Sequence, residues 1–340
     1  MNKIIGAFTL AGITALSGCS TLNPTDTDTS AVNRQHLFAP RAVNVTTFSG
    51  GLFHTLVLTT TGNVLSWGSN EFAQLGNGST VNSNLPVQVA GEGNATRLEG
   101  VVSVSAGGMG SFGRQSHSLA LKTNGSLVSW GDNQFGQLGV NSFGANPRRP
   151  LRVAGTRGIV AISAGGVHSL ALKSDGTVLS WGGNSFGQLG RATPGACVNN
   201  DSFSPIPAPV NGLANIVAIA AGSTHSLALR SDGTLLSWGA GGSGQLGDGS
   251  FTHCQLEPVI VQNKAHIKAI AAGGTHSLAL RSDGTLLSWG ENRAGQLGIG
   301  SRDNESLPVI VPGVNGVVAI AAGALRHRHP RDARRVARLG

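Results

Sequence analysis

Histidine is followed directly by serine four times in this sequence, a pairing that serves nucleophilic catalysis when the histidine takes the serine proton. The pairs begin at His117, His168, His225 and His276. Each lies in a run such as residues 168–173, where leucines alternate with small or polar residues as in a β-strand. Successive strand residues point to opposite faces, so a histidine cannot reach the hydroxyl beside it. The pairs therefore predict no catalytic dyad.

A fifth histidine, His54, belongs to the same series, and five equivalent histidines around one axis would suggest a ring of metal ligands. Equivalent positions in successive repeats are, however, farther apart than one metal ion can bridge with bonds of ~2 Å. We therefore predict buried, hydrogen-bonded histidines at these positions, with no metal and no cofactor.

Two further patterns resemble sites of chemistry. Residues 242–247 fit the Gly-x-Gly-x-x-Gly phosphate motif, which needs a strand before it and a helix after it. Here the motif coincides with a recurring Gly-Gln-Leu-Gly, which predicts a turn. Asp175, Asp232 and Asp283 each precede a glycine in a hairpin turn and do not form a converging carboxylate pair. The sequence therefore predicts no enzyme.

All of these residues belong to a sequence repeat. Tryptophan recurs with separations of 63, 51, 57 and 51 residues, a histidine stands thirteen residues before each tryptophan, and Gln-Leu-Gly begins seven residues after it. The tryptophans are Trp67, Trp130, Trp181, Trp238 and Trp289. Such a period predicts one supersecondary unit repeated along the chain.

Each unit reads as four short strands. A short apolar run comes first, a histidine-led strand follows, an Asp-Gly or Asn-Gly turn reverses the chain, and a returning strand ends at tryptophan. A fourth strand lies near a proline such as Pro86, Pro258 or Pro308, which suits an outer edge because proline lacks the N–H group. Four antiparallel strands repeated radially predict an all-β β-propeller with five complete repeats and part of a sixth.

The pattern from Ala272 to Gly298 resembles the repeat of the regulator-of-chromosome-condensation family. The resemblance covers residues 43–323, and it implies a propeller whose ring in that family has seven blades. It also raises guanine-nucleotide exchange as an alternative function, because the chromatin protein of that family acts on a small nuclear GTPase.

The pattern breaks at the C-terminus. A sixth unit opens at residues 317–323, but Arg326 and Leu339 stand where the histidine and tryptophan are expected, and residues 324–340 form a basic tail. We expect a frameshift or truncation of a longer gene, and an open ring whose exposed strand edge favours self-association. The tail carries +5 of the net charge of +8, so no basic groove crosses the repeats and nucleic acid is not an expected partner.

The N-terminus carries a targeting signal. Lys3 precedes an apolar stretch, residues 4–16, that is too short to span a bilayer. The following residues, Leu16 to Cys19, resemble the bacterial lipobox, in which the cysteine is acylated. We therefore expect a signal peptide at residues 1–18, and a lipidated Cys19 with a flexible tether at 19–42. The protein would be membrane-anchored at the cell envelope, in the outer membrane if the bacterium is diderm.

Cys197 and Cys254 each stand sixteen residues after a tryptophan, so they occupy equivalent places on neighbouring units. An oxidising compartment favours a disulfide between them. Their α-carbons would need to lie within ~7 Å, and equivalent points on neighbouring blades are usually farther apart. Both alternatives remain open at this point.

Insertions gather on one rim of the expected propeller. Residues 109–115 lengthen a first connection and residues 191–204 lengthen a third, and these connections lie at the same end of antiparallel strands. Loops on a rigid scaffold often carry binding sites. The alternative is that these loops are exposed to solvent and have no role in binding. The candidate binding residues are Phe112, Arg114, Arg148, Arg149 and Phe203.

The predicted function is a non-enzymatic binding scaffold of the cell envelope that recognises a protein or a glycan through this rim. A further alternative is inhibition of an extracytoplasmic enzyme, because the repeats are also similar to secreted propeller inhibitors of β-lactamase.

Overall fold

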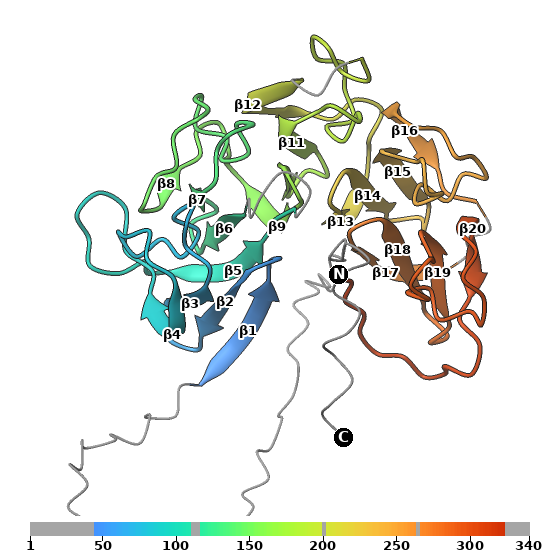
Figure 1. Cartoon of the computed structure of the whole chain (residues 1–340), viewed down its shortest axis with the longest axis horizontal. Helices are drawn as coiled ribbons and strands as arrows, with labels where there is room; N and C mark the ends of the chain where they lie inside the picture. Colours follow the sequence, from blue (N-terminus) through green and yellow to red (C-terminus); the bar gives the residue numbers. More distant parts are fainter. Residues whose placement is uncertain (1–43, 110–115, 199–201, 263–265, 324–340) are drawn as a thin grey trace, which may run out of the picture.

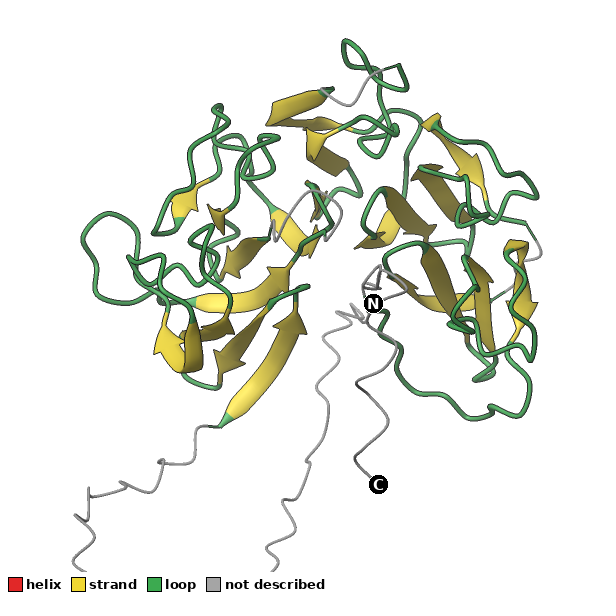
Figure 2. Ribbon diagram, viewed as in Figure 1, coloured by secondary structure: helices red, strands yellow, loops and turns green. Residues whose placement is uncertain are grey.

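The computed structural model describes residues 44–109, 116–198, 202–262 and 266–323. The predicted signal peptide, Cys19, the tether, the basic tail and two of the candidate rim residues, Phe112 and Arg114, lie outside these ranges. The described chain forms five four-stranded antiparallel sheets and no helix (Figure 2). None of its segments is therefore a helix long and apolar enough to cross a membrane. The all-β prediction and the five complete repeats are confirmed.

Each sheet is one blade, and its strands pair in sequence order. Blade 1 contains β1 (Val45–Gly50), β2 (His54–Thr59), β3 (Val64–Gly68) and β4 (Ser83–Gln88). Blade 2 contains β5 (Val101–Ala106), β6 (His117–Lys122), β7 (Leu127–Gly131) and β8 (Leu151–Arg152). Blade 3 contains β9 (Ile159–Ala164), β10 (His168–Lys173), β11 (Val178–Gly183) and β12 (Phe203–Pro209). Blade 4 contains β13 (Ile216–Ala221), β14 (His225–Arg230), β15 (Leu235–Gly239) and β16 (Gln255–Ile260). Blade 5 contains β17 (Ile267–Ala272), β18 (His276–Arg281), β19 (Leu286–Gly290) and β20 (Glu305–Ile310).

The central hairpin of each blade follows from its turn residues. In blade 3, Lys173 N donates to Thr177 O at 2.9 Å, and the Asp175 carboxylate accepts the Thr177 N–H at 2.9 Å. Gly176 has φ +84°, a conformation that residues with a Cβ rarely adopt. This turn sets the register that places Ser169 opposite Trp181, and the same register recurs in the other blades.

The hydrophobic core is divided into four clusters, each lying between two neighbouring blades. The cluster between blades 2 and 3 is typical, because Leu119 and Leu127 of blade 2 pack with Ala171 and Trp181 of blade 3. Equivalent clusters join blades 1 and 2, blades 3 and 4, and blades 4 and 5. A blade therefore buries its apolar faces only against its neighbours, as in other repeat proteins.

The blades surround a common centre as an open arc, with β5, β9, β13 and β17 nearest the centre (Figure 1). The start of the sixth unit lies in register with the other repeats, because Gly274 N donates to Gly323 O just as Gly108 N donates to Gly165 O. Residues 317–323 nevertheless form no strand.

The expectation of an open strand edge needs correction. Blades meet through side chains on their faces, so the arc ends on sheet faces and not on strand edges.

Candidate binding rim

A hydrogen-bonded chain crosses every junction between neighbouring blades. His168 Nε2 lies 2.9 Å from the Oγ of Ser226 on the next blade, and the Ser226 hydroxyl donates to the Gln188 carbonyl at 3.0 Å. The same carbonyl accepts the Trp238 indole N–H at 2.9 Å. The three other junctions repeat this arrangement, starting from His54, His117 and His225.

The bonds define the state of the histidines. Because the serine proton goes to the glutamine carbonyl, the histidine must donate through Nε2, which leaves Nδ1 as an unprotonated nitrogen. In each of these histidines Nδ1 is buried without a hydrogen-bond partner. Burial lowers the pKa of His54 to about 4 and the pKa of His117, His168 and His225 to about 3. These histidines are neutral at pH 7.

Each serine therefore serves the histidine of the preceding blade, not the histidine beside it in the sequence. The serine hydroxyls are fully buried and already donate to a carbonyl, so they have no access to a substrate. Within the described residues no three His, Cys, Asp or Glu side chains cluster as a metal site would require. The network is structural, and the surface loops remain as the candidate functional site.

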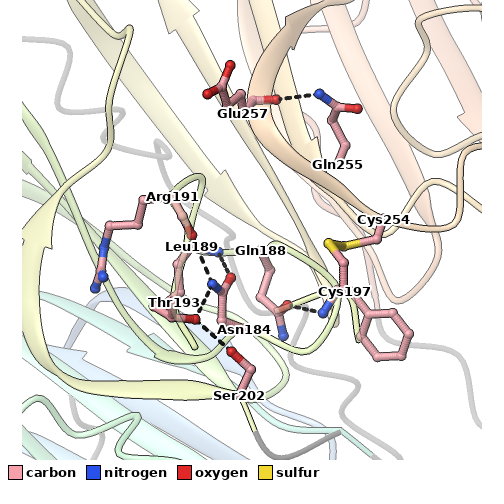
Figure 3. Close-up of a disulfide and its surroundings, with 11 residues drawn as sticks. Asn184, Gln188, Leu189, Arg191, Thr193, Cys197, Ser202, Cys254, Gln255 and Glu257 are labelled. Atoms are coloured by element: carbon pink, nitrogen blue, oxygen red, sulfur yellow. Dashed lines mark hydrogen bonds between the residues drawn. A yellow bond between two sulfur atoms is a disulfide. The ribbon is translucent and has the colours of Figure 1, made fainter. Parts of the chain in front are cut away.

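A buried asparagine shapes the loops at one rim. In the connection between β11 and β12, Asn184 Oδ1 accepts the Leu189 N–H at 2.9 Å, and its Nδ2 donates to Arg191 O at 2.9 Å (Figure 3). Asn70, Asn133 and Asn292 play the same part in blades 1, 2 and 5. An asparagine three residues after tryptophan is the sequence signal for these loops, and blade 4 carries Gly241 there instead.

A disulfide ties the rim loops of blades 3 and 4. Cys197 and Cys254 are bonded, with their α-carbons 5.7 Å apart (Figure 3). Cys197 lies in the insertion at residues 191–204, which lengthens the rim loop of blade 3. Cys197 itself has φ +63° and its backbone N–H donates to Ser185 O, which turns its side chain toward Cys254.

Aromatic contacts link the same loops from blade to blade. Phe143 of blade 2 lies against Phe203 of blade 3, with ring centroids 4.8 Å apart. Phe186 of blade 3 meets His253 of blade 4 edge to face at 5.4 Å. Several apolar side chains on these loops face solvent, with exposed fractions of 59% for Phe143, 54% for Phe251 and 85% for Val198. We call this surface the aromatic ridge: Phe143, Phe186, Val198, Phe203, Phe251 and His253.

The first connection of blade 2 reaches the same rim. Met109 lines a small apolar pocket together with Phe135, Val167 and Phe186. The first residue of the insertion at residues 109–115 therefore lies beside Phe186 of the aromatic ridge.

The other candidate residues differ in their surroundings. Phe203 belongs to the aromatic ridge, and Arg148 is exposed. Arg149 is half-buried, and its guanidinium donates to Gly93 O and Ala95 O in the linker between blades 1 and 2, so it holds two blades together. Sequence reasoning missed Phe143, Phe186, Phe251 and His253, because nothing in the repeat pattern shows which loop side chains meet across blades.

Five blades joined by equivalent buried junctions define a repeat β-propeller. The chain belongs to the RCC1-like domain family, whose model matches residues 15–328. Solved structures of the same fold include yeast RCC1 (Prp20) bound to Kap60, with a TM-score of 0.69 and 27% identity over 82% of this chain and 66% of that one. Human WBSCR16 has a TM-score of 0.68 and 26% identity, over 86% of this chain and 73% of that one.

Relatives with curated names are larger proteins. The human E3 ubiquitin-protein ligase HERC2 is 33% identical over 85% of this chain, which matches 6% of HERC2. The Arabidopsis thaliana ultraviolet-B receptor UVR8 is 30% identical over 80% of this chain, which matches 60% of UVR8. The chain thus spans less than two thirds of each of these relatives. The ligase activity and the light reception named for them are not assigned to this chain.

Proposed function

We propose that this protein is a non-enzymatic binding scaffold of the cell envelope that recognises a protein or a glycan through the aromatic ridge. The observation that carries this proposal is the ridge itself. Phe143 pairs with Phe203 between blades 2 and 3, and Phe186 pairs with His253 between blades 3 and 4. Phe143 and Phe251 are exposed to solvent, and a disulfide ties the loops of blades 3 and 4. Exposed apolar clusters of this kind mark interaction sites on soluble domains. Aromatic side chains also supply large contact areas at low entropic cost.

Guanine-nucleotide exchange is the alternative that family membership raises. A fold shared with yeast RCC1 does not transfer an activity, because function depends on the residues grafted onto the fold. The ridge of this chain is apolar, and a segment that resembles the lipobox would direct the protein out of the cytoplasm. Both features support an envelope ligand over a nucleotide-bound GTPase.

Replacing both Phe143 and Phe203 with alanine is expected to reduce recovery of the envelope partner about tenfold or more, because central aromatic contacts dominate binding energy. The measurement is a quantitative pull-down from envelope extract with the full chain as bait. Val217→Ser is the matched control, because Val217 is an exposed apolar side chain at the opposite end of the strands. Equal recovery by the double variant and the control would refute the ridge as the binding surface.

The envelope location makes a separate prediction. Cells that express the full chain and are fed radiolabelled palmitate should incorporate label into the protein, and Cys19→Ser should abolish that label, since acylation requires the thiol. Label retained by the variant, or a wild-type protein that carries none, would contradict the lipid anchor. Cys197→Ser serves as a control, since this residue lies on the rim.

A further inference from the structure

Every junction inside the chain uses the same two half-surfaces. One half, which we call the socket, offers the carbonyl of the Gln-Leu-Gly glutamine and the bare backbone of its glycine. The other half, which we call the plug, brings the tryptophan of the next blade. At the four internal sockets a Cβ placed on the glycine would lie 2.6 to 2.9 Å from the indole nitrogen, so only glycine admits the plug. These glycines are Gly76, Gly139, Gly190 and Gly247.

Blade 5 presents a socket that no described residue fills. Gly298 is the equivalent glycine, and a Cβ on it would meet only Val311, at 3.4 Å. His276 has no serine of a next blade among the described residues. Leu278 and Leu286 are half-buried, whereas their counterparts Leu119 and Leu127 are fully buried. This face of blade 5 therefore has the same residues as one side of an internal junction, but no described residue supplies the other side.

Blade 1 presents the matching plug. Trp67 is half-buried, whereas the other four tryptophans are fully buried with their N–H groups bonded to a carbonyl. Phe48 pairs with Val57 on the same face of the sheet and is 68% exposed, while the equivalent Val104 of blade 2 is buried. Thr55 keeps a hydroxyl at the position of the junction serines.

We propose that the plug of one copy docks into the socket of a second copy, head to tail, so that the Trp67 indole donates to the carbonyl of Gln296 of the partner subunit. The occupant is a second copy because this chain carries both halves of an interface that it already builds four times. Such a contact is heterologous, so each copy retains one free half and association continues beyond the dimer as concentration rises.

Docking competes with one segment of the same chain. Residues 317–323 lie where the innermost strand of a docked blade would pack, held by the backbone bonds from Gly274 N to Gly323 O and from Val317 N to Gly284 O. The partner's β1 must displace this segment, which weakens association. Concentration-dependent assembly, and not a permanent oligomer, is the expected behaviour.

Sedimentation of the full chain, with Cys19→Ser as the common background, tests the proposal. The wild type should associate with rising concentration. Acrylamide quenching of tryptophan fluorescence reports mainly Trp67, because the other four indoles are buried, and this quenching should fall as the protein associates. Trp67→Ala should remove the plug, and Gly298→Asn should fill the socket while tolerating φ +69°. Each variant should associate at least tenfold more weakly. Gly300→Asn, at φ +84° and with nothing within 4 Å of its Cβ, is the matched control and should behave as the wild type.

Mixing the two variants gives the sharpest result. Trp67→Ala retains the socket and Gly298→Asn retains the plug, so together they should form a one-to-one heterodimer and nothing larger. A protein that stays monomeric at all concentrations would overturn the proposal. This holds also if acrylamide quenching shows that a segment of the same chain shields Trp67. Association as strong as that of the wild type in either variant would also overturn it, since this would indicate another surface such as the rim.

Discussion

Lowering the pH from 7 to 5 is expected to remove roughly 6 kcal/mol from the free energy of unfolding, mainly through the four junction histidines. Their folded pKa values are about 3 to 4, below the usual 6.5, so the unfolded chain binds protons that the folded chain does not. The stability contributed by neutral histidine is complete above pH 6.5 and is lost as the pH falls toward the folded pKa values. The loss is comparable to the whole stability of a typical domain, about 5 to 15 kcal/mol.

One carboxyl group acts in the opposite direction. Burial raises the pKa of Asp132 to about 6, although bonds from the Gln134 N–H and the Gln137 amide favour its charged form. The folded chain therefore binds a proton at Asp132 before the unfolded chain does, which adds stability as the pH falls. Near pH 5, unfolding takes up four protons at the histidines and releases one at Asp132, a net uptake of three. The free energy of unfolding therefore falls by about 4 kcal/mol for each pH unit that the pH is lowered.

Urea unfolding at a series of pH values, followed by tryptophan fluorescence, measures this slope. His168→Gln is the informative variant, because its amide nitrogen can still donate to Ser226 but does not titrate. Its slope should be smaller by one proton, about 1.4 kcal/mol per pH unit. Equal stability at pH 7 and pH 5 in the wild type would show that the junction histidines are not held neutral.

Loss of the disulfide is expected to lower the free energy of unfolding by about 4 kcal/mol, the entropic value for a loop of this size in the unfolded chain. Cys197 and Cys254 are separated by 57 residues and close a loop that includes most of blade 4. The bond spans two blades, so breaking it also frees the rim loops that carry Val198 and His253. We therefore expect weaker stability and a more mobile ridge from a single change.

Two measurements on the Cys19→Ser chain check this expectation. The denatured, unreduced protein should contain no free thiol, since the sequence has three cysteines and two of them are bonded. Reduction should shift the urea midpoint downward, and the Cys197→Ser, Cys254→Ser double variant should reproduce that shift and no longer respond to reductant. Two titratable thiols before reduction would contradict the disulfide.

The sequence predicted the blades well because each blade is a local structure. Trp181 stands opposite Ser169 through one hairpin, and the turn at Asp175 and Gly176 specifies that hairpin without help from distant residues. The same locality explains why five repeats could be counted from tryptophan spacing alone. Predictions at the junctions were less complete. The five histidines were predicted to be buried, but four of them bond a serine that belongs to the following blade.

The rim shows the same division. Phe203 was singled out because it lies in an insertion, but its contact with Phe143 spans two blades and depends on the angle between them. Arg149 was expected to be available for a ligand, whereas the linker between blades 1 and 2 supplies two carbonyls that engage it. The two cysteines left both alternatives open, because sequence spacing does not give the distance between neighbouring loops.

By itself the sequence determined the elements of this protein: the strands, the tight turns, the number of complete repeats and the equivalence of positions between them. Periodicity and turn chemistry act over a few residues, so they can be read without coordinates. The tertiary structure shows which side chains meet: the serine of the next blade bonded by four of the histidines, the aromatic ridge, and the plug and socket that no described residue covers. Those contacts depend on the twist and spacing of whole sheets, which no local pattern encodes.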